Sequence, residues 1–173
     1  PNWPDIKIQA QNPHNYISGR ACDHYNRYEE DFDIARSLGH NAHRFSIEWS
    51  RIEPREGEFD KKEIEHYRKV IAALRARGIE PFVTLWHWPL PLWVAEKGGW
   101  GWRSAPEYFA RYAELISKEL NDVNFWLTLN EPNIYAGHVY IKAAWPHGSK
   151  NPILYWQVLN RLISAHKGAY QAI

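Results

Sequence analysis

Hydrophobic positions along the chain follow two periods, one typical of buried strands and one typical of amphipathic helices. Three short apolar runs at residues 41–49, 79–86 and 123–130 are rich in strand-forming residues, and segments with helical spacing precede, separate and follow them. The strands begin near residues 41, 79 and 123, so one strand and one helix repeat over roughly forty residues. This alternation predicts parallel strands joined by right-handed helical crossovers.

The third run ends abruptly in Asn130, Glu131 and Pro132. Its nearly continuous apolar character predicts a parallel strand buried on both faces. Because proline cannot donate a ladder hydrogen bond, Pro132 ends the strand and leaves Glu131 at its carboxyl end. Ligands bind at this end of the strands in α/β folds, so Glu131 is the first candidate functional residue.

Helix start and stop signals fit the same alternation. The expected helix starts are Asp23, Asp60, Ser104 and Asn151, and the first two helices should stop at Gly39 and Gly78. Residues 87–103 are expected to form a long aromatic loop, and residues 133–150 an irregular or short helical stretch. Residues 1–16 are expected to form a poorly defined amino-terminal segment.

Two architectures fit this pattern, a doubly wound sheet and part of an eight-stranded α/β barrel. No glycine-rich phosphate-binding turn follows any strand, which removes the usual reason for a doubly wound fold. Polar residues instead gather at the strand ends, which favours the (β/α)8 TIM barrel. A complete barrel typically needs about 250 residues, so the sequence predicts one partial barrel domain over 1–173, about the first half, with an unpaired sheet edge.

Charge and cysteine content narrow the range of partners. The 21 basic and 20 acidic residues are interspersed, which argues against a nucleic-acid partner. No apolar stretch is long enough to span a membrane and no signal peptide is seen, so a cytoplasmic location is the default expectation. Cys22 is the only cysteine and is expected to be an inert small side chain.

Aromatic residues are abundant, with ten Trp, ten Tyr and six Phe making 15% of the chain. Five of the Trp fall between Trp86 and Trp102. They are interpreted either as core packing or as a platform on which sugar rings stack, and composition alone favours neither.

A carboxylate beside an amide, an imidazole and indoles suits glycoside hydrolysis, which needs a carboxylic acid to protonate the leaving oxygen. Metal chemistry has less support, because His40 and His43 lie at the start of a strand without a matching carboxylate pattern. No nucleophile elbow surrounds Ser46, Ser50 or Ser104, which argues against a serine hydrolase.

Three motifs in order resemble glycoside hydrolase family 1, the β-glucosidase and β-galactosidase family. They are HRFSIEWSR at residues 43–51, PFVTLWHW at 81–88 and TLNEP at 128–132, with YEED at 28–31 and GGW at 98–100 also similar. The resemblance runs from about residue 17 to residue 173. It implies an eight-stranded α/β barrel that hydrolyses β-glycosides with retention of configuration and without a cofactor or metal.

The resemblance also implies roles for individual residues. Glu131 is similar to the family's general acid/base, and Asn130 to the amide that binds the 2-hydroxyl of the sugar. His87 matches the imidazole that binds the 3-hydroxyl, with Trp88 beside it as a further substrate-binding residue. Arg44 matches the arginine that orients the nucleophile; a structural ion pair for Arg44 and plain packing for Trp88 remain alternatives.

Two family features have no counterpart in the sequence. Residues 1–16 lack the first strand with its sugar-binding glutamine, and the nucleophilic glutamate of the second half is absent; Glu48 is not expected to replace it. The chain alone is therefore expected to be inactive, with a small-molecule β-glycoside as the substrate of the parent enzyme. A complementary barrel half or a second copy is the expected partner, and a non-catalytic scaffold or sugar-binding half barrel is the alternative.

Overall fold

A computed structural model describes residues 19–145 and 148–173, so the expected amino-terminal segment 1–16 lies outside the described residues. Three parallel strands form one sheet in chain order, with β2 in the centre. They are β1 (Ala42–Ser46), β2 (Glu80–Trp86) and β3 (Phe125–Leu129). The strand–helix alternation confirms the α/β prediction and is the arrangement of a partial (β/α)8 barrel.

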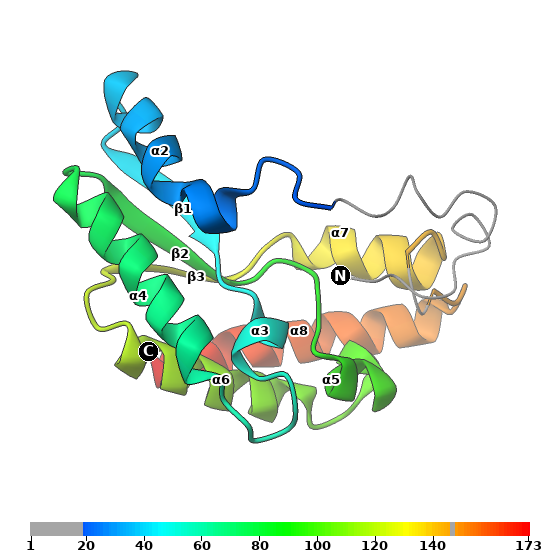
Figure 1. The fold of residues 1–173 in the computed structure, drawn as a ribbon. Helices are drawn as coiled ribbons and strands as arrows, with labels where there is room; N and C mark the ends of the chain where they lie inside the picture. Colours follow the sequence, from blue (N-terminus) through cyan, green and yellow to red (C-terminus); the bar gives the residue numbers. More distant parts are fainter. Residues whose placement is uncertain (1–18, 146–147) are drawn as a thin grey trace.

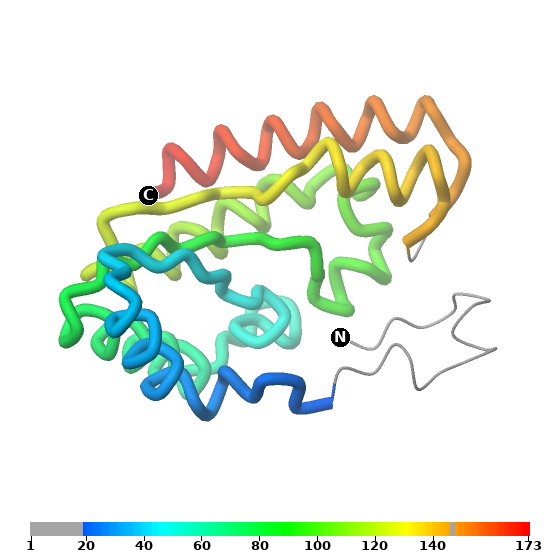
Figure 2. The backbone as a smooth tube through the Cα atoms, turned by 90° about the horizontal axis from the view of Figure 1, so that it is seen from above, coloured from blue at the N-terminus to red at the C-terminus, as the bar shows by residue number. Residues whose placement is uncertain are grey.

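Helices connect and flank the strands. They are α2 (His24–Ser37), α3 (Trp49–Ile52), α4 (Lys61–Ala76), α5 (Leu92–Glu96), the 3-10 helix η2 (Gly99–Gly101), α6 (Ala105–Glu119), α7 (Pro132–Ala136), the π-helix η3 (Gly137–Ile141) and α8 (Pro152–Ala172). Helices α4, α6 and α8 lie on one side of the sheet in Figure 1, and Figure 2 shows the strands side by side. The side of the sheet away from these three helices is its open face.

Strand register explains which side chains face the helices. Arg44 pairs with Phe82 and Phe82 with Phe125, so these positions share the open face. The alternate positions Val83 and Leu85 are fully buried on the helix side, where the Tyr112 hydroxyl of α6 donates to the Leu85 carbonyl at 3.2 Å. The sheet is thus apolar toward the helices and mixed on its open face.

Most of the Trp-rich stretch belongs to the core. Trp86, Trp93 and Trp100 are at most 9% exposed, and Trp100 packs edge-on against Trp86 with ring centroids 5.1 Å apart. The predicted aromatic loop contains α5 and η2, which direct Trp93 and Trp100 inward. Core packing therefore accounts for these three Trp, whereas Trp88 and Trp102 remain partly exposed.

The expected helix starts are mostly confirmed. The Asp60 side chain accepts hydrogen bonds from the amides of Lys62 and Glu63, and the Asn151 side chain accepts one from the Leu154 amide. Asp23 also precedes a helix, but its side chain does not cap it; Asp23 lies in the left-handed region with φ 53°.

Two strand predictions were wrong in detail. The first strand ends at Ser46 rather than at residue 49, because Trp49 already begins α3 and Glu48 is its N-cap residue. The third strand is not buried on both faces; Phe125 is 47% exposed. The reason is that β3 is an edge strand with one open face in the described part of the chain.

None of the helices within residues 19–145 and 148–173 combines the length and apolar character needed to cross a membrane.

Candidate active site

The carboxyl ends of the three strands bring the predicted site residues to one edge of the sheet. Arg44 lies on β1, His87 directly follows β2, and Asn130 and Glu131 directly follow β3. The Asn130 amide donates to the Trp86 carbonyl at 2.9 Å, which extends the parallel pairing to the residue before Glu131. The fold thus positions residues far apart in the sequence at one end of parallel strands.

Arg44 joins the three strands through hydrogen bonds. Its Nε donates to Oγ1 of Thr84 at 2.9 Å, and one terminal nitrogen donates to Oδ1 of Asn130 at 2.6 Å. No salt bridge of Arg44 is present within the described residues. The guanidinium therefore bonds two neutral oxygens, and both alternatives for Arg44, support of a nucleophile and a structural ion pair, remain predictions.

Asn130 has its orientation fixed by these neighbours. It is 7% exposed, and its side-chain oxygen is occupied by Arg44. Trp88 donates from Nε1 to the Asn130 carbonyl at 3.1 Å, so this indole bonds the strand end rather than only packing against it. The side-chain nitrogen of Asn130 remains a donor for a ligand.

His87 is held by a residue that the sequence did not single out for the site. Its Nδ1 lies 2.9 Å from Oγ of Ser46 on the neighbouring strand. Partial burial and the charge of Arg44 lower the pKa of His87, while the carboxylates of Glu131 and Glu48 act in the opposite direction. The imidazole is therefore biased toward its neutral form.

Glu131 differs from its neighbours in both backbone and side chain. Its φ and ψ are 42° and 57°, in the left-handed region that costs a non-glycine residue roughly 1–2 kcal/mol. The side chain is exposed and makes no hydrogen bond or salt bridge within residues 19–145 and 148–173. A strained backbone that presents a free carboxylate is an arrangement found at functional sites.

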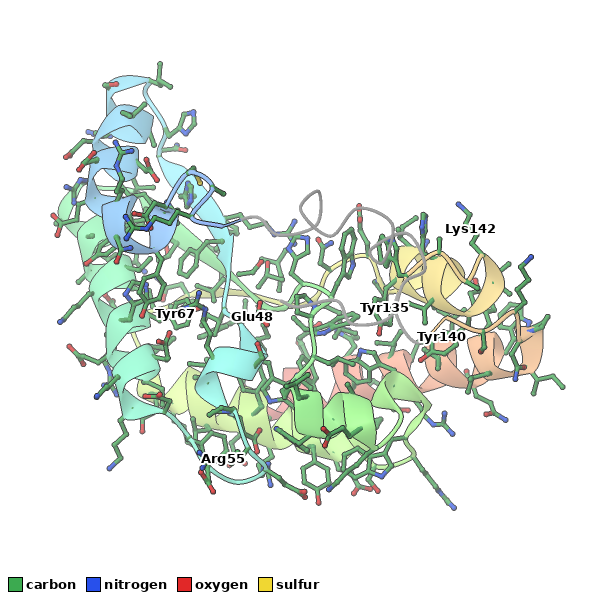
Figure 3. The ribbon with its side chains drawn as sticks, turned by 45° about the vertical axis from the view of Figure 1, so that its right-hand side comes forward. Glu48, Arg55, Tyr67, Tyr135, Tyr140 and Lys142 are labelled. Atoms are coloured by element: carbon green, nitrogen blue, oxygen red, sulfur yellow. The ribbon has the colours of Figure 1, made fainter. Side chains whose placement is uncertain are left out.

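Two other carboxylates follow β1. Glu48 accepts a hydrogen bond from the Ser50 hydroxyl at 2.7 Å, and its amide donates to the hydroxyl of Tyr67 at 3.0 Å. Figure 3 places Glu48 beside Tyr67, on the β1 side of the sheet. Burial raises the pKa of Tyr67 to about 12, so this hydroxyl stays protonated at neutral pH.

Glu53 is a buried carboxylate that the sequence analysis missed. It is 0% exposed and accepts hydrogen bonds from Trp49 Nε1 at 2.9 Å, from the Gly57 amide at 2.8 Å and from Arg111. Its carbonyl accepts a further hydrogen bond from Trp93. In the sequence, Glu53 is marked only by its position four residues after Trp49. This spacing does not reveal that Arg111 of α6 is its partner.

The segment after Glu131 forms two short helical elements. Helix α7 continues into the π-helix η3, a rare local geometry that is frequent near functional sites. Figure 3 shows Tyr135, Tyr140 and Lys142 along this segment. Tyr140 is 4% exposed, and burial raises its pKa to about 12, so its ring packs in the core as a neutral group.

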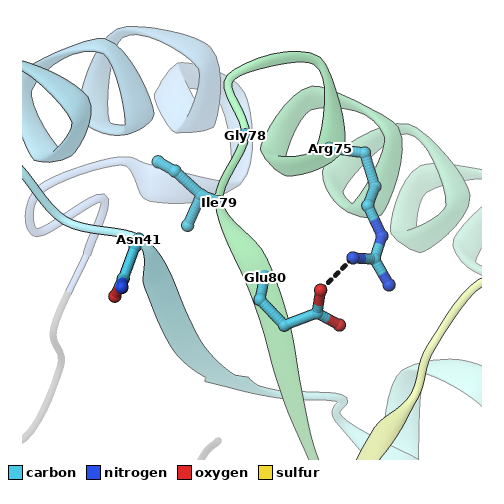
Figure 4. Close-up of a pocket in the computed structure, with 5 residues that line it drawn as sticks. All are labelled: Asn41, Arg75, Gly78, Ile79 and Glu80. Carbon is cyan, nitrogen blue, oxygen red and sulfur yellow. Dashed lines mark hydrogen bonds and ion pairs between the residues drawn. The ribbon is translucent and has the colours of Figure 1, made fainter.

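A cavity of about 290 Å³ lies at the opposite, amino-terminal end of the strands (Figure 4). Asn41, Arg75, Gly78, Ile79 and Glu80 line it. Arg75 pairs with Glu80 and donates to the Asp122 carbonyl at 2.8 Å. The two charged side chains that line the cavity therefore bind each other. In barrels this end serves stability rather than chemistry.

No cluster of three or more His, Cys, Asp or Glu within the described ranges has metal-binding geometry. His43 instead packs edge-on against the buried Phe32, with ring centroids 5.1 Å apart.

Comparison with known proteins identifies one family. The family model described as Glycosyl hydrolase family 1 matches residues 3–173. Beta-glucosidase A of Thermotoga maritima is 40% identical over 153 residues, which are 86% of this chain and 34% of that protein. Beta-glucosidase 6 of Oryza sativa subsp. japonica is 47% identical over 119 residues, which are 67% of this chain and 23% of that protein.

Solved structures give the same result. The beta-glucosidase from Thermotoga maritima in complex with deoxynojirimycin has a TM-score of 0.84 and 37% sequence identity. The match covers 87% of this chain and 35% of that chain. The chain therefore spans about a third of the length of the relatives it matches.

Proposed function

Because the chain belongs to glycosyl hydrolase family 1, we propose that it is the part of a retaining β-glycosidase that carries the general acid/base. The observation that carries this proposal is the free Glu131 carboxylate beside the fixed Asn130 amide at the end of β3. Glu131 protonates the glycosidic oxygen as the bond to the anomeric carbon breaks. It then removes a proton from the water that releases the sugar.

The remaining residues bind the sugar and prepare the nucleophile. Asn130 donates from its side-chain nitrogen to the 2-hydroxyl, and His87 binds the 3-hydroxyl. Trp88 keeps the end of β3 in place through the Asn130 carbonyl. Arg44 offers an uncompensated positive charge to a second carboxylate and thereby favours its ionised, nucleophilic form.

The second carboxylate comes from the part of the barrel that this chain does not contain. A retaining mechanism needs two carboxyl groups about 5–5.5 Å apart. Glu53 cannot serve, because it is buried and fully hydrogen-bonded, and Glu48 binds Ser50. The chain alone is therefore expected not to turn over a glycoside.

The open surfaces support completion by the rest of a barrel. Phe82 and Phe125 stack at 4.5 Å on the open face of the sheet. Helix α8 exposes a stripe of apolar residues with 53–75% exposure at helical spacing, namely Ile153, Trp156, Ile163 and Tyr170. Exposed apolar surface of this kind marks an interface, and we propose that the remaining strands and helices of a family barrel cover it.

A complementation experiment tests the proposal. The chain is mixed with a polypeptide that contains the remaining strands of a family relative, and hydrolysis of methyl β-glucoside is measured. We expect turnover from the mixture, none from either part, and its loss in Glu131→Gln. With a dinitrophenyl glycoside, whose leaving group needs no proton, the initial burst should survive this substitution.

Glu58→Gln is the matched control, because Glu58 is exposed and its side chain pairs with the exposed Arg55. Unchanged methyl β-glucoside turnover in Glu131→Gln would refute the acid/base role.

The second candidate is a non-catalytic half barrel whose open surface pairs with another copy, and the α8 stripe is the observation in its favour. Sedimentation separates the two candidates. A stable dimer that stays inactive with the complementary polypeptide would favour self-association, and an active one-to-one complex would favour the enzyme.

A further inference from the structure

The Ser46–His87 contact links β1 to the turn after β2, on the open face of the sheet. Ser46 pairs with Thr84 in the strand register, and the Ile47 amide donates to the Thr84 carbonyl at 2.9 Å. The backbone thus fixes Ser46 next to His87, and its Oγ lies 2.9 Å from Nδ1. No other side chain in the described ranges hydrogen-bonds to either group.

From this geometry we propose that Ser46 is a positioning residue that selects the tautomer of His87. The Ser46 hydroxyl donates to Nδ1, so the ring proton resides on Nε2, the ring nitrogen that makes no hydrogen bond among the described residues. The hydroxyl has Nδ1 as its one acceptor among the described residues, whereas the opposite tautomer leaves the hydroxyl proton without a protein partner.

Tautomer selection requires a neutral imidazole ring, and the surroundings of His87 favour this form. Partial burial and the charge of Arg44 lower the pKa of His87, which disfavours the imidazolium with protons on both nitrogens. A neutral imidazole presents either a donor or an acceptor at Nε2, and the hydrogen bond at Nδ1 decides which.

The consequence for binding rests on the proposed function. With the proton on Nε2, His87 donates to a sugar hydroxyl, and Asn130 donates beside it from its side-chain nitrogen. Two adjacent donors fit two neighbouring hydroxyl oxygens of a sugar ring. In the other tautomer His87 would accept, and the pair would lose this match.

The test measures the tautomer directly in the 173-residue chain. Long-range proton–nitrogen correlation spectra of the ¹⁵N-histidine-labelled protein at pH 7.5 distinguish protonated from unprotonated ring nitrogens, and His87→Gln assigns the signals. Ser46→Thr keeps the hydroxyl, and Ser46→Val has the same shape without it. Ser50→Ala removes a nearby hydroxyl that bonds Glu48 instead.

We expect Nδ1 to be unprotonated and Nε2 protonated in the parent chain, Ser46→Thr and Ser50→Ala. Ser46→Val should lose this single pattern and give averaged shifts for both nitrogens. A protonated Nδ1 in the parent chain, or an unchanged pattern in Ser46→Val, would overturn the inference. Because no turnover is measured, this result is independent of whether the chain completes a glycosidase.

Discussion

Two carboxylates, one in the connection after β1 and one directly after β3, have opposite surroundings. Glu53 is completely buried and receives hydrogen bonds from a Trp, a backbone amide and Arg111. Glu131 is exposed, its carboxylate has no hydrogen-bond partner within residues 19–145 and 148–173, and its backbone is left-handed. The first joins α3 to α6, and the second is left free for a ligand. Both carboxylates lie in connections that follow a strand, and the number of their hydrogen-bond partners distinguishes them.

The largest expected effect concerns Glu131. In the completed barrel, Glu131→Gln should lower kcat/KM for methyl β-glucoside by about 10²–10⁴-fold, the usual contribution of a general acid. The same substitution should change the free energy of unfolding of the chain by less than about 0.5 kcal/mol, because no protein contact is lost. Urea unfolding and steady-state kinetics measure the two quantities; a large stability loss with retained activity would reverse the comparison.

Glu53→Gln should show the opposite combination. It keeps the shape of the side chain but removes the charge that Arg111 contacts. The free energy of unfolding should therefore fall by about 2 kcal/mol. Urea unfolding followed by Trp fluorescence measures this loss, with Glu58→Gln on the same loop as control. Equal stability of the two variants would show that the Glu53 network contributes little.

The backbone at Glu131 gives a smaller effect. Glycine adopts the left-handed region without the clash of Cβ, so Glu131→Gly should be more stable than Glu131→Gln by about 1 kcal/mol. The matched comparison uses two variants that both lack the carboxylate, so only the backbone differs. Urea unfolding tests it, and a less stable glycine variant would indicate that φ at this position is not strained.

The smallest expected effect is a change of the free energy of unfolding with pH, and it comes from two imidazoles rather than from these carboxylates. Burial lowers the pKa of His43 and of His66, so the folded state binds fewer protons than the unfolded state below about pH 6.5. The two histidines therefore do not lower the free energy of unfolding well above that pH, and they lower it progressively as the pH falls. Urea unfolding at pH 7.5 and 5.5 should show reduced stability at the lower pH, and the reduction should shrink in a His43→Gln/His66→Gln double variant. An unchanged reduction would assign it to other groups.

Local patterns were sufficient for most of the fold. Strand-forming runs, the Asp60 cap and the proline after Glu131 each act within a few residues, so their effects can be read along the chain. The extent of strand burial could not be read this way. The apolar run in β3 resembles a strand covered on both sides, but its exposure depends on which segments lie beside it.

The site shows the same division. Candidate residues were found because strand ends and family motifs mark them, and their roles remain predictions. The contacts of Arg44 with Thr84 and of Ser46 with His87 depend on the register between strands, which forty intervening residues conceal. Glu53 and Arg111 are 58 positions apart, so their pairing required the three-dimensional arrangement.

The chain order of the strands also bears on synthesis at the ribosome. Each strand pairs with the strand that precedes it in the sequence, and β2 lies between β1 and β3. A strand that leaves the exit tunnel therefore finds its neighbour already available, and pairing does not wait for later segments. Each addition closes only the connection between consecutive strands, which holds α3 and α4 before β2 and α5, η2 and α6 before β3. Translation can therefore build this part of the molecule one unit at a time, from the amino terminus onward.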